Sequence, residues 1–319
     1  MKRETLERQQ VWVYLAAIIL GLILGSAAPI LAPTLELLLW PALAILLYVT
    51  FTQVRFDQLP AAFKDARFVS AALIGNFVVL PVVVWGVLML VPDDPAIRLG
   101  LLLVLLVPCT DWFLTFAHQA GGDLRRAIAI TPALLVAQML LLPLYLWLFM
   151  GSEFMEIVSA GRMVTVFAVI IVLPLVLAWL TERWVDESAP RVALIERLGW
   201  FPVPLLAFVL FLIAASQVEA VLDSLPLMGD ILIACIAFLI GAVLCGLMIG
   251  RAFKLPVPQA RTLLFTLSTR NSFVVLPFAL ALPVAWELAA IVIVFQSLFE
   301  LFGMLALLWL VPRKLLPHV

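Results

Sequence analysis

Charge is scarce in this sequence. Charged residues make up 12% of the 319 positions and hydrophobic residues 66%, and the mean hydropathy is +1.21. A soluble domain is about half apolar and a quarter charged. So few charged side chains cannot cover a water-facing surface when the apolar residues come in repeated blocks of about 20. The composition therefore excludes a water-soluble globule and predicts a polytopic protein whose main partner is the lipid bilayer.

Motifs of enzymes and of nucleotide-driven machines are also missing. The chain has no glycine-rich nucleotide-binding loop, no HExxH, no GxSxG and no polar segment large enough for an ATPase domain. Its three cysteines, Cys109, Cys235 and Cys245, lie in apolar blocks at spacings that fit neither a zinc site nor a disulfide framework. The net charge of −1 gives no indication of nucleic acid binding. We therefore expect no enzyme, no cofactor, no metal site and no nucleic acid partner.

Ten apolar blocks of about 20 residues, separated by Pro, Gly and charged residues, predict ten membrane-spanning helices. In chain order they cover residues 11–30, 35–54, 67–91, 97–119, 124–150, 162–181, 199–218, 227–250, 259–283 and 285–311. We therefore predict an all-α fold in which residues 1–319 form a single transmembrane transporter domain.

The distribution of Lys and Arg predicts the orientation of these spans. If the N-terminus is cytoplasmic, sixteen of the 19 basic residues flank the spans on the cytoplasmic side. Only Arg98 and Arg162 lie on the other side, and Arg270 lies within a span. Basic residues near span ends are retained in the cytoplasm. The pattern predicts a multi-pass protein of the plasma (inner) membrane with both termini cytoplasmic.

The span count also allows an internal repeat. Residues 1–150 and 162–311 would each hold five helices, so that corresponding helices cross the membrane in opposite senses. This is the condition for the inverted-topology repeat on which many secondary transporters are built. We expect a 5+5 inverted repeat.

Two corresponding spans, the fourth and the ninth, are interrupted by polar residues. Pro108 interrupts the fourth span, and a polar run from Ser268 to Ser272 interrupts the ninth. Backbone groups freed inside a membrane must line a protein-walled site, and paired interruptions of this kind mark transporter binding sites. We therefore predict that these broken helices cross and form the substrate site. The predicted substrate contacts are Asn76, Cys109, Thr110, Asp111, Arg270, Asn271 and Ser272.

Three ionisable residues, Asp111, Arg270 and Glu300, lie deep within predicted spans, where an uncompensated charge is costly. An Asp111–Arg270 ion pair could simply hold the two broken helices together. Alternatively, Arg270 binds an anionic substrate or is the counter-ion that Asp111 loses when it takes up a proton. Glu300 could carry a proton or, uncharged, hydrogen-bond a neighbouring helix. The candidate ion-coupling residues are Asp111, Gln138, Gln296 and Glu300.

For the remaining polar residues a purely structural role is an alternative to a role in transport. Asn76 and Gln138 are single amides of the kind that often hold transmembrane helices together. Cys109 could be a thiol ligand for a thiophilic metalloid, but a lone buried cysteine often acts as a small apolar side chain.

Local motifs of the chain resemble the bile acid/sodium symporter superfamily, and most of all its arsenite-efflux permease branch. The run Pro108-Cys109-Thr110 with the later Gly122-Asp123 is similar to the fourth-span signature of that branch. Asn76-Phe77 with Pro81 resembles its third-span motif. The resemblance implies ten helices with crossing fourth and ninth spans, and it implies a transport role for Cys109.

The ninth span departs from the family pattern. The arsenite permeases carry Asn-Asn-Phe-Glu here, and aligning Phe273 places Ser272 on the second Asn and Val274 on the Glu. Sodium-coupled members are similar to a design with a ninth-span glutamate and a third-span glutamine, where this chain has Val274 and Asn76. These two replacements argue against sodium coupling. Neither pattern contains Arg270 or Asp111, so we expect the charge arrangement to serve a different solute or coupling ion.

Three functional hypotheses follow. The first is a proton-coupled secondary transporter that exports arsenite, a metalloid solute, by alternating access. The second is an ion-coupled transporter of small organic anions of the bile acid or carboxylate type, in which Arg270 binds the anion. The third is a receptor or scaffold that does not transport, against which the charges within the membrane argue.

Overall fold

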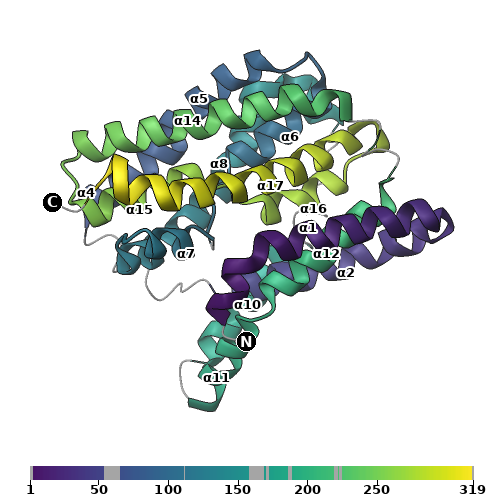
Figure 1. Cartoon of the computed structure of the whole chain (residues 1–319), viewed down its shortest axis with the longest axis horizontal. Helices are drawn as coiled ribbons and strands as arrows, with labels where there is room; N and C mark the ends of the chain where they lie inside the picture. The colour runs from purple at the N-terminus through teal and green to yellow at the C-terminus, as the bar shows by residue number, and fades with distance from the viewer. Residues whose placement is uncertain are drawn as a thin grey trace. The chain divides into compact units, whose positions relative to one another are not determined.

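The structure is a computed structural model of the chain (Figure 1). It describes residues 3–53, 65–110, 112–157, 172–185, 189–218 and 225–317 and the single positions 169 and 222. These residues are helical apart from turns and short extended segments, and their one strand-like feature is an isolated antiparallel bridge. The chain is therefore an all-α protein, as predicted.

Five helices of the described part are long and apolar enough to cross a membrane. They are Pro29–Phe51, Ala66–Leu90, Leu124–Gly151, Leu225–Ala252 and Glu287–Leu315. Three shorter apolar helices accompany them, at Trp12–Ala27, Pro95–Leu105 and Pro202–Ser216. Together with the hydropathy these helices make the chain an integral membrane protein. The full set of ten spans and their inverted repeat stay predictions.

Packing divides the chain into two compact units, each drawn from both halves of the sequence. Residues 1–53 and 160–226 form unit 1, and residues 54–159 and 227–319 form unit 2. Each unit thus takes one stretch from each of the two predicted repeats.

Unit 1 is a group of helices around α12, which packs against α1 and α2 (Figure 1). Its elements are α1 (Arg3–Ala27), α2 (Ala32–Phe51), α10 (Leu173–Val185), α11 (Ala189–Leu198) and α12 (Pro202–Ser216). Small residues let α1 and α12 approach closely, since a Cβ atom on Gly25 would lie 2.3 Å from the Ala215 carbonyl oxygen. The hydroxyl groups of Tyr48 and Thr181 lie 3.0 Å apart and join α2 to α10.

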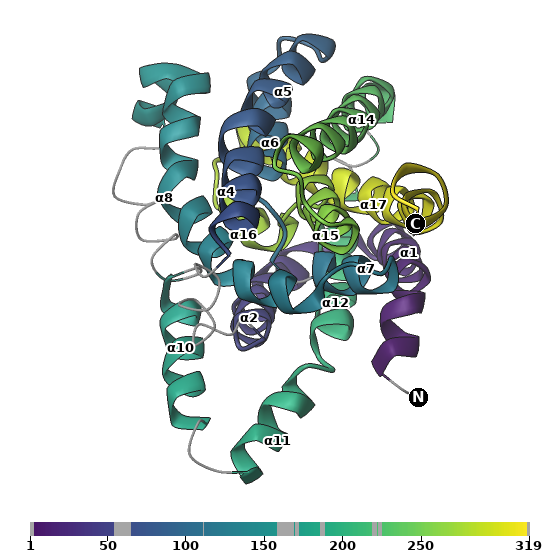
Figure 2. The ribbon, with the colours of Figure 1, turned by 90° about the vertical axis from the view of Figure 1, so that its left-hand side faces the viewer.

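Unit 2 contains both interrupted spans. Its elements before residue 160 are α4 (Ala66–Ile74), the π-helical turn η3 (Gly75–Val79), α5 (Leu80–Val87), α6 (Pro95–Leu105), α7 (Trp112–Gln119) and α8 (Leu124–Ile157). The elements after residue 226 are α14 (Met228–Ala252), α15 (Val257–Ser268), α16 (Ser272–Leu280) and α17 (Glu287–Leu310). The helix α14 packs against α5, α15 and α17, and α17 also packs against α6 (Figures 1 and 2).

Some boundaries differ from those predicted. The first predicted span, 11–30, is part of a helix that begins at Arg3, because the polar N-terminal residues continue the helix. The first part of the predicted sixth span, 162–181, lies mostly outside the described residues, and the helix seen in its second part, α10, runs on to Val185. The sequence predicted a connection between residues 181 and 199, yet α11 forms within it. Charged residues there interrupt the hydropathy but not the helix.

The contact of α6 with α17 leaves no room for a side chain at Gly100. A Cβ atom at this position would lie 2.8 Å from both the Ala289 carbonyl oxygen and Val292 Cβ. We expect Gly100→Ala to lower the free energy of unfolding by about 1–3 kcal/mol, because α6 must move away from α17. Thermal unfolding of the purified protein in detergent measures this.

Gly86→Ala is the matched control, since a Cβ atom on Gly86 of α5 would meet nothing within 4 Å. Its melting temperature should equal or slightly exceed that of the wild type, because alanine favours a helix by about 1 kcal/mol over glycine. Equal stability of the two variants would contradict a tight α6–α17 contact.

Candidate functional site

The two interrupted helices of unit 2 meet at their breaks. The first break separates α6 from α7, and the second separates α15 from α16. The Cys109 N–H donates to the Thr269 carbonyl oxygen at 3.1 Å, and the Asn271 N–H donates to the Val107 carbonyl oxygen at 2.8 Å. Pro108 and Arg270 thereby form an antiparallel bridge. Each break supplies hydrogen-bond partners to the other, which a membrane interior cannot do.

Four helix ends converge at this crossing. The carboxyl ends of α6 and α15 carry carbonyl groups without helical partners, and the amino ends of α7 and α16 carry such N–H groups. Asn271 caps α16 by accepting from the Val274 N–H at 3.4 Å. Its Nδ2 donates to Thr110 Oγ1 at 3.0 Å. Asn271 and Thr110, both predicted substrate contacts, thus join the two breaks by a side-chain hydrogen bond.

The Arg270 guanidinium is buried at the crossing, with 2% of the residue exposed. Its Nη2 donates to Asn76 Oδ1 at 3.0 Å and to the carbonyl oxygens of Thr266 at 3.1 Å and Leu267 at 2.5 Å. Its Nη1 donates to the Leu105 carbonyl oxygen at 3.3 Å. Nε has no hydrogen-bond partner among the described residues.

A π-helical turn presents Asn76 to Arg270. Pro81 has no N–H, so the Phe77 carbonyl has no donor four residues ahead and instead accepts from the Tyr145 hydroxyl of α8. The Leu80 N–H reaches back to Gly75, which gives the i to i−5 pattern of a π turn. Asn76 Nδ2 donates to the Ala72 carbonyl oxygen at 3.0 Å, which leaves its Oδ1 for the guanidinium.

A carboxylate from α17 lies on the other side of Arg270. Glu300 Oε2 accepts from the Arg270 backbone N–H and from Gln296 Nε2, both at 2.8 Å. Ser272 Oγ lies 3.4 Å from Gln296 Oε1. Glu300 and Gln296 are both almost completely buried. The structure thus brings two of the predicted ion-coupling residues to the crossing.

The other predicted site residues divide into three cases. Cys109 is buried within the first break, beside Thr269. Gln138 is buried on α8, and neither its amide oxygen nor its nitrogen has a hydrogen-bond partner in the described part of the chain. Asp111 lies outside the described residues, so its ion pair with Arg270 stays a prediction. No cluster of metal-ligating side chains is found among the described residues.

Phe238 could not be singled out from the sequence alone. Its ring on α14 lies with its centroid 5.3 Å from Arg270 Cζ, a cation–π distance. One aromatic residue in an apolar helix carries no signal by itself, so only the packing of α14 on α15 identifies it.

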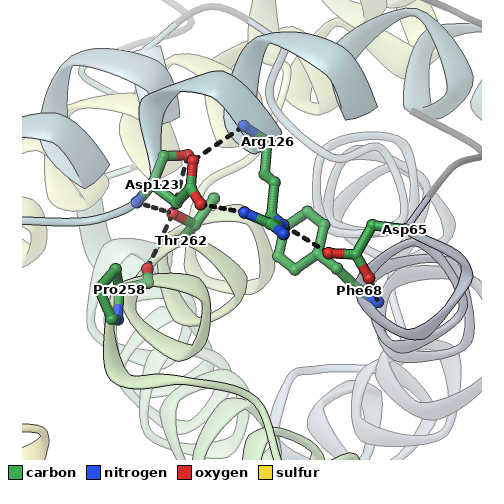
Figure 3. Close-up of polar contacts among 6 residues, drawn as sticks. All are labelled: Asp65, Phe68, Asp123, Arg126, Pro258 and Thr262. Atoms are coloured by element: carbon green, nitrogen blue, oxygen red, sulfur yellow. Dashed lines mark hydrogen bonds and ion pairs between the residues drawn. The ribbon is translucent and has the colours of Figure 1, made fainter. Parts of the chain in front are cut away.

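A second polar network holds the opposite ends of three helices of unit 2 together (Figure 3). Arg126 at the start of α8 donates through Nε to Asp65 Oδ2 at 2.5 Å and through Nη1 to Asp123. Asp65 also caps α4 by accepting from the Phe68 N–H. Thr262 Oγ1 of α15 accepts from the Asp123 N–H at 2.8 Å. The network fixes the first half of α15, which lies away from the second break, to α4 and α8.

The Gly122-Asp123 motif is explained by this network. A Cβ atom on Gly122 would lie 2.7 Å from the Ala117 carbonyl oxygen and 2.8 Å from Thr262 Oγ1, so only glycine fits. Asp123 then follows at the N-terminus of α8 and accepts from the Arg126 N–H. Sequence reasoning noted the motif as part of a resemblance but did not predict its partners Arg126 and Thr262.

Comparison with known proteins gives two findings. A family model described as the Sodium Bile acid symporter family matches residues 40–224, which include the first break but not the second. The arsenical-resistance protein Acr3 of Corynebacterium glutamicum is 31% identical to the chain over 93 residues. The aligned stretch covers 29% of this chain and 25% of that relative, so the likeness spans about a quarter of its length.

The pKa of Asp65 makes the second network sensitive to acid. Burial raises the pKa of its carboxyl, but hydrogen bonds from Arg126 and the Phe68 N–H, with the charges of Arg126 and Arg67, outweigh burial and hold it below its ordinary value of 3.8. The ionised carboxylate therefore stabilises the fold above about pH 4, and this contribution is lost as the pH falls through the folded-state pKa. We expect Asp65→Asn to lower the melting temperature at neutral pH, by an amount that shrinks on acidification.

Asp93→Asn is the control, because Asp93 also pairs with an arginine, Arg98, but its side chain is 88% exposed. Thermal unfolding of both variants and the wild type across an acidic pH series gives the comparison. A constant offset between Asp65→Asn and the wild type at every pH would contradict a depressed pKa.

Proposed function

Because the chain belongs to the Sodium Bile acid symporter family, we propose that it is a secondary transporter that works by alternating access around the two paired breaks. The observation that carries this proposal is the antiparallel bridge between Pro108 and Arg270, where four helix ends meet beside buried ionisable side chains. Freed backbone groups and half-helix ends of this kind bind solutes and ions in transporters. The proposal includes ten spans in a 5+5 inverted repeat, with both termini cytoplasmic.

We propose arsenite, in its neutral form arsenous acid, as the solute, moved out of the cell. Trivalent arsenic is thiophilic, and Cys109 places a thiol within the first break. Thr110, Asn271 and Ser272 offer hydroxyl and amide groups for the hydroxyls of the solute. The partial likeness to an arsenical-resistance protein supports the same solute class.

We propose a proton as the coupling ion, carried by Glu300 with Gln296 as its hydrogen-bond partner. Glu300 is a buried carboxylate that meets the Arg270 backbone N–H at the crossing, so its charge acts directly on the break. Protonation of Glu300 would weaken its hold on the second break. Asp111 is the second candidate proton carrier, and Gln138 belongs to the same proposal.

A small organic anion is the second candidate solute. The Nε–H of Arg270 has no acceptor among the described residues, so the guanidinium keeps a donor that a carboxylate oxygen could use. The family description, which names a bile acid symporter, points in the same direction. Uptake of radiolabelled carboxylates and bile acids separates this solute from arsenite.

Arsenite tolerance tests the first candidate solute. In cells that lack their own arsenite efflux, the wild type should restore growth on arsenite, and Cys109→Ser should return growth to the level of cells without the transporter. The reason is that a hydroxyl group cannot replace a thiol as an arsenic ligand.

Cys245→Ser is the matched control, because Cys245 lies on α14 and no contact with another described residue places it at the crossing. This variant should protect cells as the wild type does, at equal expression. If the wild type gives no tolerance, the arsenite proposal is wrong, and if Cys109→Ser protects fully, the thiol is not at the site.

The pH dependence of transport tests the role of Glu300. In inside-out membrane vesicles with an acidic interior, wild-type arsenite uptake should rise with the pH gradient and collapse when an ionophore removes it. Glu300→Gln should transport at a rate that no longer responds to the gradient, because an amide carries no proton at these pH values.

Glu287→Gln serves as the control from the same helix, because Glu287 lies in the first turn of α17, about three and a half turns before Glu300. It should keep the wild-type response. A full gradient response in Glu300→Gln would exclude Glu300 as the carrier and transfer the test to Asp111→Asn.

A further inference from the structure

Each hydrogen bond from the Arg270 guanidinium to a described residue ends on an oxygen that carries no formal charge. Its hydrogen bonds run to three backbone carbonyl oxygens and one side-chain amide oxygen at 2.5–3.3 Å. They come from three separate segments of unit 2, namely α6, α15 and the π turn η3. Carbonyl and amide oxygens in this number are the ligands that proteins offer to hard metal cations.

The origin of the carbonyls explains why they attract a positive charge. Leu105 is the last residue of α6, and Thr266 and Leu267 lie in the last turn of α15. Carbonyl groups in these positions have no helical partner and carry the negative end of the helix dipole. In secondary transporters, such half-helix carboxyl ends and unwound carbonyls coordinate the coupling cation.

Two further side chains complete the enclosure. The bond from Asn76 Nδ2 to the Ala72 carbonyl oxygen turns Asn76 Oδ1 toward the guanidinium. The Phe238 ring covers the guanidinium at 5.3 Å, and the negative face of an aromatic ring also attracts cations. The side chain thus lies in surroundings suited to a cation on several sides, at a depth where 2% of the residue is exposed.

We propose that Arg270 is a covalently tethered cation that occupies the place of a dissociable coupling cation, so that transport requires neither sodium nor potassium. This inference rests on the proposed transporter function, and it excludes sodium and potassium as coupling ions of that transporter. A tethered cation cannot leave the site and so takes no energy from a cation gradient. Its charge holds the two helix carboxyl ends together throughout the cycle, and a titratable carboxylate is left as the coupling group.

Sodium-dependent stability of the purified protein tests the inference without any solute. Melting temperatures are measured in sodium chloride, potassium chloride and choline chloride at equal ionic strength. The wild type should unfold at one temperature in all three salts. Arg270→Ala leaves the oxygens without their cation, so its melting temperature should rise with the logarithm of the sodium or potassium concentration and not with choline.

Three further variants identify the site. Arg270→Lys keeps a tethered cation and should be as insensitive to sodium as the wild type. Arg270→Ala combined with Asn76→Leu removes one oxygen ligand and should lose most of the gain in sodium. Arg98→Ala, which removes an arginine paired with Asp93 near the surface, should show no cation response.

Two results of the melting series would overturn the inference. One is a saturable rise of the wild-type melting temperature in sodium. The other is a folded Arg270→Ala protein that melts at the same temperature in all three salts. Recovery of monodisperse Arg270→Ala in sodium but not in choline would support the inference. If this variant folds in no salt, Arg270→Met, which keeps the aliphatic stem, replaces it in the same series.

Vesicle transport separates a failure of this inference from a failure of the proposed function. Wild-type transport that persists when choline replaces sodium and potassium supports the tethered cation, and transport that stops in choline refutes it. An absence of arsenite transport in every salt contradicts the proposed solute alone, because the melting temperatures do not depend on a solute.

Discussion

The structure of the candidate site depends on one constraint, that backbone groups freed inside a membrane need hydrogen-bond partners. Breaking α6 from α7 or α15 from α16 alone would leave such groups exposed to lipid. The two breaks satisfy each other through the Cys109–Thr269 and Asn271–Val107 hydrogen bonds. Neither interruption is therefore stable without the other, and the crossing is fixed in register by its own backbone. The side chains that matter for function are placed by this pairing.

The need for a buried positive charge at the crossing follows from the same geometry. Two helix carboxyl ends at one point concentrate negative partial charge, and a cation must balance it in a medium of low dielectric constant. Arg270 supplies that cation from within the second break, and its backbone N–H in turn binds the Glu300 carboxylate. Arg270 therefore links both breaks to α17. Its guanidinium binds the carboxyl ends of α6 and α15, and its backbone N–H binds Glu300 on α17. A change in the protonation of Glu300 would be felt by the backbone of the second break, while the guanidinium stays on its carbonyls.

Sequence reasoning reached the positions of the two breaks but not the groups that surround Arg270. Pro108 and the polar run 268–272 are readable because a proline and consecutive polar residues contradict a long apolar helix. Asn76 stood out as a single amide within a span and as part of a motif that resembles the family, whereas its contact with Arg270 depends on a π turn that Pro81 induces. Phe238 and the carbonyls of Leu105, Thr266 and Leu267 could not be predicted, because backbone oxygens leave no mark in a sequence. The paired network of Asp65, Asp123 and Arg126 was missed because those residues looked like solvated charges at span ends.

The charged side chains at the crossing bind protein groups, whereas neutral polar side chains lie at the breaks, and this difference bears on the kind of solute. Both Nη atoms of Arg270 donate to protein oxygens, and Glu300 Oε2 accepts from two protein donors. The groups left at the breaks, Thr110, Asn271, Ser272 and the thiol of Cys109, are neutral as hydroxyl, amide and thiol. Such groups suit a small neutral solute that forms hydrogen bonds and binds sulfur, whereas an anion would find only the Nε–H of the guanidinium without an acceptor among the described residues. A neutral solute also lets a proton alone decide the charge of the site, so that solute binding and coupling act on different atoms of one crossing.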